Sequence, residues 1–277
     1  MTILHLACVQ LCGSNQLQAN VTMIREAVAM AASQGAQLIS LPEVCNLVER
    51  NPAKAAAILC DEQTDPVLQC LKTLARQHRC WIHAGSLALR HGILDKAVNR
   101  AFIINAEGAI IARYDKIHLF DATLPGGTVI RESDGFHPGE NPVLATSEWG
   151  SIGLSICYDL RFAGLYRWLA RAGAVMLAVP AAFTRPTGQA HWHVLLRARA
   201  IETGCFVFAS AQCGDHRDGR QTYGHSMIID PWGSVLAEAN TCPEIIYADL
   251  DLDAVTRTRA LLGYHELDQT DRFEPPR

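Results

Sequence analysis

The segment SIGLSICYDLR, residues 151–161, joins an apolar run to a polar turn, and a helical pattern over 162–172 follows it. This order predicts a strand up to residue 156 and a sharp turn into a helix. A side chain at such a turn is exposed at the carboxyl edge of the sheet, where α/β proteins place their sites. The reactive form of cysteine is the thiolate, which a nearby helix N-terminus favours. Cys157 is therefore a candidate nucleophile, and the alternative is one more buried thiol.

Short apolar runs alternate with helical patterns along the rest of the chain. A helix is predicted from an Asn20 cap to Gly35, another after Asp65-Pro66, and a third over 191–203, ended by Gly204. Strands are predicted at 4–11, 37–41, 81–87, 97–104, 109–114, 174–179, 205–211, 225–229, 235–238 and 245–250. The pattern predicts an α/β fold, either one mixed sheet or two packed sheets with helices outside.

The chain of 277 residues is 49% hydrophobic and 19% charged, which is typical of a globular protein with a large core. No linker, internal repeat or low-complexity segment interrupts it. We therefore predict a single domain over 1–277, with the polar segment 263–277 as a C-terminal arm.

Charge and cysteine content limit which kinds of molecule the protein can bind and which compartment it suits. The net charge is −4 and no basic block occurs, which argues against nucleic acid. No apolar run approaches the roughly 20 residues that span a bilayer, and the first residues do not resemble a signal peptide. The ten cysteines form no CxxC pair and no zinc spacing with histidine. They predict reduced thiols in the cytoplasm and imply no metal. Catalysis by a cysteine nucleophile would need no cofactor.

Two further residues stand where predicted strands end. Glu43 follows the strand 37–41 among apolar neighbours, and desolvation there would raise its pKa toward that of a general base. Lys116 follows the strand 109–114, where an ammonium could pair with Glu43 and face developing negative charge. Each residue alone is more often an ordinary surface side chain. Together with Cys157, they could meet in one pocket if the strands are neighbours.

Three ordered segments of the chain are similar to the nitrilase superfamily of carbon–nitrogen hydrolases. They are Leu41-Pro-Glu43, Tyr114-Asp-Lys-Ile-His-Leu119 and the stretch from Gly153 to Phe162. The resemblance implies a Glu43-Lys116-Cys157 triad, with Glu132 supporting the lysine. It also implies a four-layer α-β-β-α sandwich, commonly dimeric, which agrees with the two-sheet option.

Later segments resemble the Nit branch, closest to the deaminated glutathione amidases and next to the ω-amidases. They are Ala190-His-Trp192, Arg197–Thr203, Ala211-Gln-Cys-Gly214 and Tyr223–Met227, followed by Asp230-Pro-Trp-Gly233. The chain departs from the branch at Ala163-Gly164, at Gln189 and over 262–267.

The resemblance implies hydrolysis of the side-chain amide of a small carboxylic or α-keto acid through a cysteine thioester. Deaminated glutathione is the first expected substrate; α-ketoglutaramate-like amides or carbamoyl amines are alternatives. The expected oxyanion donors are Lys116 and the backbone N–H of Tyr158. Arg161 and Arg185 are candidates to bind a substrate carboxylate through two hydrogen bonds from the guanidinium. Arg161 could instead pair with an acidic neighbour such as Asp159 or Glu132.

Three other functions are compatible with the same sequence. A Cys-His hydrolase would use Cys157 with His118 or His225. A nitrilase-like scaffold would bind a partner without catalysis, although it need not keep an intact triad. An acyltransferase would pass the same thioester to an amine.

Overall fold

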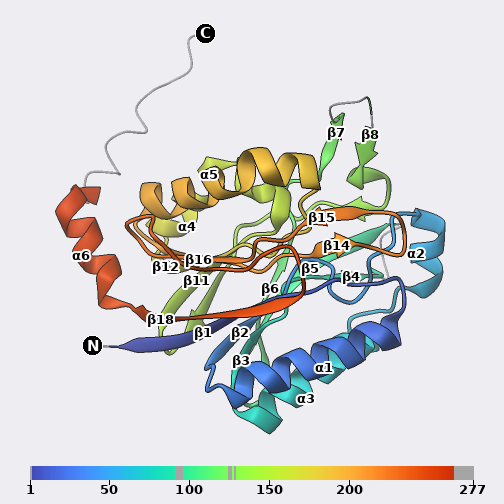
Figure 1. Cartoon of the computed structure of the whole chain (residues 1–277), viewed down its shortest axis with the longest axis horizontal. Coiled ribbons are helices and arrows are strands. Elements are labelled where there is room, and N and C mark those ends of the chain that lie inside the picture. Colours follow the sequence, from blue (N-terminus) through green and yellow to red (C-terminus); the bar gives the residue numbers. More distant parts are fainter. Residues whose placement is uncertain (1, 92–95, 124–126, 128, 265–277) are drawn as a thin grey trace.

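Two β-sheets pack face to face, and helices cover their outer faces (Figure 1). The computed structural model describes residues 2–91, 96–123, 127 and 129–264. The first sheet has the strand order β18-β1-β2-β3-β5-β4, with β6 and β9 also paired to β5. The second has the order β10-β11-β12-β13-β16-β17. Helices α1 and α3 lie outside the first sheet and α4 and α5 outside the second. The predicted α-β-β-α sandwich is confirmed.

The bounds of the elements are as follows. The first sheet contains β1 (Ile3–Gln10), β2 (Leu38–Ser40), β3 (Trp81–His83), β4 (Leu87–Leu89), β5 (Ala97–Ile104), β6 (Ile110–Asp115), β9 (Phe136–His137) and β18 (Glu244–Asp251). The second contains β10 (Leu144–Ser147), β11 (Gly150–Leu154), β12 (Ala174–Ala178), β13 (Phe206–Ala209), β16 (Met227–Ile229) and β17 (Val235–Glu238). Two small pairs are β7 (Asp121–Thr123) with β8 (Val129–Arg131), and β14 (Cys213–Asp215) with β15 (Gln221–Tyr223).

The helices are α1 (Leu17–Ser33), α2 (Pro52–Ile58), α3 (Pro66–His78), α4 (Ala163–Arg171), α5 (Arg185–Thr203) and α6 (Asp253–Leu262). Short 3₁₀ turns occur at Glu132–Asp134 and Cys157–Arg161. None of the described helices is both long and apolar enough to cross a bilayer.

Strand β1 shows how the sequence builds the layers. Its side chains alternate between two cores, as the two-residue period of a strand requires. Leu6 and Cys8 belong to the core between the sheets, where Phe208 of β13 also packs. Ala7 and Val9 belong to the core beneath α1 and α3. A strand that is buried on both faces therefore reads as one continuous apolar run.

Several predicted boundaries are wrong, and each has a local reason. Helix α1 begins at Leu17, so Asn20 is not its cap. The Asn20 side chain is buried and donates instead to the backbone oxygens of Ser14 (2.8 Å) and Asn46 (2.7 Å). Helix α5 begins at Arg185, six residues before the predicted start at 191, with a proline in its first turn. The predicted strand 81–87 is divided into β3 and β4 by a turn at Gly85.

Candidate active site

Cys157 lies at the turn that follows β11, with its side chain buried. Its φ of +51° is in the left-handed region that non-glycine residues rarely adopt. The turn is held by hydrogen bonds from the Cys157 N–H to the Pro180 oxygen (2.9 Å) and from the Ile156 N–H to the Asp159 carboxylate (2.8 Å). Backbone strain of this kind costs about 1–3 kcal/mol and is concentrated at functional sites.

Glu43 lies three residues beyond the end of β2 and is only 4% exposed. Its loop is fixed by a hydrogen bond from the Val44 N–H to Ser86 Oγ (3.0 Å) and by one from Gln212 to the Glu43 carbonyl (3.0 Å). Gly85 passes so close that an added Cβ would lie 2.0 Å from the Pro42 oxygen. Only glycine fits there, and the close approach fixes the loop that carries the carboxylate.

Lys116 directly follows β6 and is 2% exposed. Its Nζ lies 2.9 Å from Glu43 Oε1 and 2.8 Å from Glu132 Oε2. Asn99 of β5 donates from Nδ2 to the same oxygen of Glu43 (3.0 Å) and to Glu132 Oε1 (3.4 Å). Glu132 also accepts from the Phe120 N–H (2.6 Å). A buried ammonium is thus enclosed by two hydrogen-bonded carboxylates, which is the condition for keeping such a charge in an interior.

The environment sets the protonation states of the three groups. Burial raises the pKa of Glu43, but the charge of Lys116 and hydrogen bonds from Cys157, Lys116 and Asn99 bring that pKa below its usual value. Burial alone would lower the pKa of Lys116, but Glu132 and Glu43 hold it well above its usual value. Burial and the negative charge of Glu43 raise the pKa of the Cys157 thiol, against the smaller opposing effect of Lys116.

The resting site therefore contains a thiol, a carboxylate and an ammonium. The expectation that desolvation would leave Glu43 with a raised pKa is wrong, because the charge of Lys116 and the hydrogen bonds from Cys157, Lys116 and Asn99 together outweigh burial. The thiol of Cys157 is hydrogen-bonded to the Glu43 carboxylate, and the backbone N–H of Ala182 is directed at the sulfur. A thiol facing a fixed carboxylate can transfer its proton, and the neighbouring donors can face the charge that results.

Two contributors were not predicted from the sequence, Asn99 and the backbone of Ala182. Asn99 is a fully buried amide inside a strand that is otherwise nearly all apolar, and this contrast was the available signal. Ala182 contributes only its N–H, which no side-chain pattern reveals.

Tyr158, Arg161 and Arg185 are the other residues expected to contact the substrate. The Tyr158 N–H belongs to the 3₁₀ turn that begins at Cys157. The guanidinium carbon of Arg161 lies 5.6 Å from the ring centres of both Tyr158 and Phe183, and Nη2 lies 3.2 Å from His191 Nδ1. Arg185, at the start of α5, is exposed and pairs with Asp215 (3.0 Å).

The acidic neighbours that Arg161 could have paired with are engaged elsewhere. Glu132 binds Lys116, and Asp159 accepts from the Tyr114 hydroxyl (2.7 Å) and lies 2.7 Å from His118 Nδ1. His118 also stacks on Phe162, with 3.6 Å between ring centres. His225, the other candidate partner of Cys157, lies 2.8 Å from Glu238 instead.

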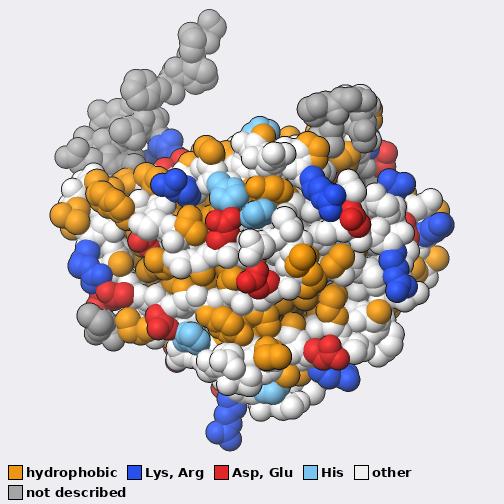
Figure 2. All heavy atoms as spheres, viewed as in Figure 1, with side chains coloured by type: hydrophobic (Ala, Val, Ile, Leu, Met, Phe, Trp, Pro, Cys, Tyr) orange, Lys and Arg blue, Asp and Glu red, His pale blue; other side chains and the backbone are white. Residues whose placement is uncertain are grey.

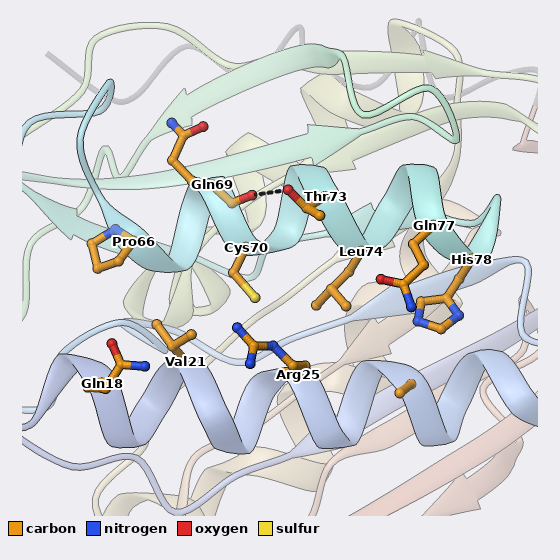
Figure 3. A pocket seen from close by; sticks show the side chains of 11 residues that line it. Gln18, Val21, Arg25, Pro66, Gln69, Cys70, Thr73, Leu74, Gln77 and His78 are labelled. Atoms are coloured by element: carbon orange, nitrogen blue, oxygen red, sulfur yellow. Dashed lines mark hydrogen bonds between the residues drawn. The ribbon is translucent and has the colours of Figure 1, made fainter.

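A separate groove of about 610 Å³ lies between α1 and α3, outside the first sheet (Figure 3). Its lining includes Gln18, Arg25, Gln69, Cys70 and His78. Because none of the three converging residues lines it, this groove does not belong to the candidate active site.

Comparison with known proteins gives a consistent result. The sequence profile of the family described as "Carbon-nitrogen hydrolase" matches residues 5–260. A protein of Synechocystis named deaminated glutathione amidase is 41% identical over 260 residues, which cover 91% of this chain and 93% of that protein. The human protein of the same name is 40% identical, over 96% of this chain and 83% of its own.

Among solved structures, the Caenorhabditis elegans NitFhit protein superposes with a TM-score of 0.89 at 33% identity. The match covers 98% of this chain and 66% of that fusion protein. The fold, the three ordered motifs and these matches agree, and the chain belongs to the carbon–nitrogen hydrolase family.

Proposed function

We propose that this protein is an amidase that hydrolyses the side-chain amide of a small carboxylic or α-keto acid through a thioester on Cys157. The observation that carries the proposal is the buried Glu43–Lys116 pair, 2.9 Å apart, with the Cys157 thiol hydrogen-bonded to Glu43. Deaminated glutathione is the proposed substrate, in line with the names of the relatives. The alternative is an ω-amidase acting on α-ketoglutaramate-like amides, or another small-amide or carbamoyl-amine hydrolase.

In the proposed mechanism, Glu43 takes the thiol proton as the sulfur of Cys157 attacks the amide carbon. Lys116 and the Tyr158 N–H stabilise the tetrahedral oxyanion; losing one such donor commonly costs roughly 100- to 1,000-fold in rate. Glu43 then gives the proton to the leaving nitrogen, the C–N bond breaks, and a thioester remains. Glu43 next takes a proton from water, whose oxygen attacks the thioester. The proton passes to the departing sulfur, restoring the thiol and releasing the acid.

Glu132 and Asn99 are proposed as supports for this machinery. Glu132 provides a second negative charge against Lys116, and Asn99 donates to both carboxylates. Their bonds fix the positions of the base and the ammonium before substrate arrives, which reduces reorganisation in the transition state.

Arg161 is proposed to hold the substrate carboxylate. It lies four residues beyond the nucleophile, and its guanidinium is flanked by the rings of Tyr158 and Phe183. Arg185 remains a second candidate, although it is exposed and paired with Asp215. If the proposal is right, Arg161→Met raises KM for the best substrate more than it lowers kcat. An unchanged KM in the double variant with Arg185→Met would contradict both assignments.

The decisive experiment is a screen for ammonia and amine release over small amides that carry an α-keto acid, with Cys157→Ala as the blank. Turnover by the wild type and none by the variant supports the proposal. Mass spectrometry of the wild type quenched with acid during turnover should show an acyl adduct on Cys157. Full activity of Cys157→Ala would exclude the mechanism. Failure of every amide to turn over would favour the scaffold, and turnover only with an added amine acceptor would favour the acyltransferase.

We further propose that the protein is a cytoplasmic homodimer. All ten cysteines are free thiols, as a reducing compartment favours. Trp168 of α4 and Val194 of α5 are 48% and 69% exposed, and exposed apolar side chains on adjoining helices suit an interface. Light scattering coupled to size exclusion should give twice the 30.3 kDa chain mass. A monomer at working concentration would contradict the dimer without affecting the amidase proposal.

A further inference from the structure

A second cluster of chemically competent side chains lies outside the proposed active site. His193 of α5, His225 just before β16 and Glu238 at the end of β17 converge from three separate elements. Their ligand atoms all lie within 4.8 Å of one another. Figure 2 shows histidine and acidic side chains gathered over this part of the molecular surface. The proposed amidase mechanism uses none of the three residues.

The two histidines share one carboxylate oxygen. His193 Nε2 and His225 Nδ1 each lie 2.8 Å from Glu238 Oε1. Two imidazoles and a carboxylate are the ligand types that Zn²⁺ prefers, and three protein ligands leave a fourth position open.

The backbone and the neighbouring rings hold His225 in place. Its φ is +56°, and its carbonyl accepts from Trp192 Nε1 (2.7 Å) while its N–H donates to the Asn240 oxygen (3.0 Å). The Tyr223 ring stacks on its imidazole, with centroids 4.3 Å apart. Strained backbone conformations that the surroundings fix in this way are concentrated at functional positions. The imidazole is therefore oriented before any ligand arrives.

The cluster is also open to solvent. The side chains of His193, His225 and Glu238 are 36%, 21% and 33% exposed, so an ion has an entry path. Ligand atoms around a tetrahedral zinc ion stand roughly 3.4 Å apart, given bonds of about 2.0–2.1 Å. The present separations require only small side-chain rotations to reach that arrangement.

We infer that His193, His225 and Glu238 form a binding site for a divalent transition-metal ion of the zinc class. On binding, the imidazole nitrogens that now donate to Glu238 become ligands and give up those hydrogens. A neutral imidazole carries its hydrogen on the other nitrogen after exchange through water, and an imidazolium releases one proton to solvent. The carboxylate turns from hydrogen-bond acceptor to ligand, and water takes the open position. No oxidation change or further reactant is involved.

The test is a titration of the chelator-treated full-length protein with Co²⁺, a coloured substitute for Zn²⁺, followed by Zn²⁺ competition. The wild type should bind one equivalent at this site and develop visible d–d absorption without intense thiolate charge-transfer bands. That distinction separates the cluster from the cysteines, of which Cys242 is exposed. His193→Ala and the nearly isosteric Glu238→Gln should each weaken binding by more than the roughly 10- to 100-fold that loss of an outer-shell partner costs.

His5→Ala is the matched control, because His5 forms another histidine–carboxylate pair, 2.6 Å from Asp249. It should bind the ion like the wild type. Zn²⁺ should also raise the Tm of the wild type and the control more than that of the two site variants. Absence of binding to the wild type, or equal binding to His193→Ala and Glu238→Gln, would show that the cluster is only a hydrogen-bond network. Neither outcome depends on amide turnover.

Discussion

At the scale of single residues, the pH dependence of the reaction distinguishes a carboxylate base from a histidine base. Lys116 and three hydrogen bonds hold the pKa of Glu43 below its usual 4.5 despite burial. Glu43 therefore stays ionised down to acid pH, and kcat/KM should not fall as pH decreases through the histidine range near 6.5. A profile of kcat/KM from pH 5 to 8, with circular dichroism confirming the fold, checks this. A loss of activity centred near pH 6.5 would instead favour a Cys-His enzyme.

Replacing Asn99 should change the pH at which kcat/KM begins to fall on the acid side of the profile. Its hydrogen bond to Glu43 is one of the contacts that lower the Glu43 pKa. Asn99→Ala should therefore shift the acid limb of kcat/KM to higher pH and lower kcat. Asn105→Ala, in the turn that ends the same strand, is the control and should leave the limb in place. An unmoved limb in Asn99→Ala would mean that the amide has no part in setting the base.

The proximity of Glu43, Lys116 and Cys157 could be predicted from the sequence, because each follows the end of a strand and the three segments resemble ordered family motifs. Asn99 could not, because it lies within β5 and its role depends on which strand runs beside it. The net pKa of Glu43 was beyond the sequence for a related reason. Burial was inferred from apolar neighbours and a pairing with Lys116 was expected, but the sequence does not show how many hydrogen bonds add to that charge, and the bond from Asn99 is one of them.

At the scale of elements, helices could be predicted where the buried face appears in the sequence as regularly spaced apolar residues. Helix α3 begins at the predicted Asp65 cap and buries Leu68, Leu71 and Leu74 on one face. Helices α2 and α6 were not predicted. In α2 no residue is buried, and in α6 only Val255 and Thr258 are, so neither leaves an apolar stripe to find.

His83 of β3 gives the interface between the sheets a dependence on pH. Its ring is fully buried, its Nδ1 lies 2.9 Å from Ser40 Oγ of β2, and its Nε2 has no partner among the described residues. Ser40 in turn accepts from Ser210 Oγ (2.9 Å), beyond the end of β13 in the second sheet. Burial lowers the pKa of His83 from 6.5 to about 3, so the folded protein keeps this imidazole neutral.

Between pH 6.5 and about 3, the unfolded chain binds a proton at His83 that the native protein does not. The free energy of unfolding should therefore fall with decreasing pH by about 1.4 kcal/mol per unit from this group. His83→Gln removes the titration, so the stability of the wild type relative to the variant should decrease by that slope from pH 6.5 to 5. Urea unfolding at a series of pH values measures it. A stability difference that does not change with pH would contradict a neutral buried His83.

At the scale of the whole molecule, the alternation of apolar runs and helices indicated layers but left open one sheet or two. Continuous apolar strands do not reveal which face meets which layer, and the family resemblance was needed to choose. Nor does the sequence show that the chain returns to its beginning, where β18 pairs with β1 along Ile3–Gln10. That pairing spans the chain and places α6 beside the second sheet, which only tertiary packing determines.

Arg259 of α6 connects the C-terminal segment to the second sheet through hydrogen bonds. Its guanidinium donates to the backbone oxygens of Ala174 (2.8 Å) and Thr203 (3.1 Å), at the start of β12 and the end of α5. Arg259→Met leaves these carbonyls without their donor, and an unsatisfied buried polar group costs about 1–3 kcal/mol. Arg257→Met, two residues earlier, loses only an exposed pair with Asp251 and should change stability by less than about 0.5 kcal/mol. Denaturant unfolding of both variants measures the difference, and equal effects would show that the Arg259 hydrogen bonds do not stabilise the attachment of α6 to the second sheet.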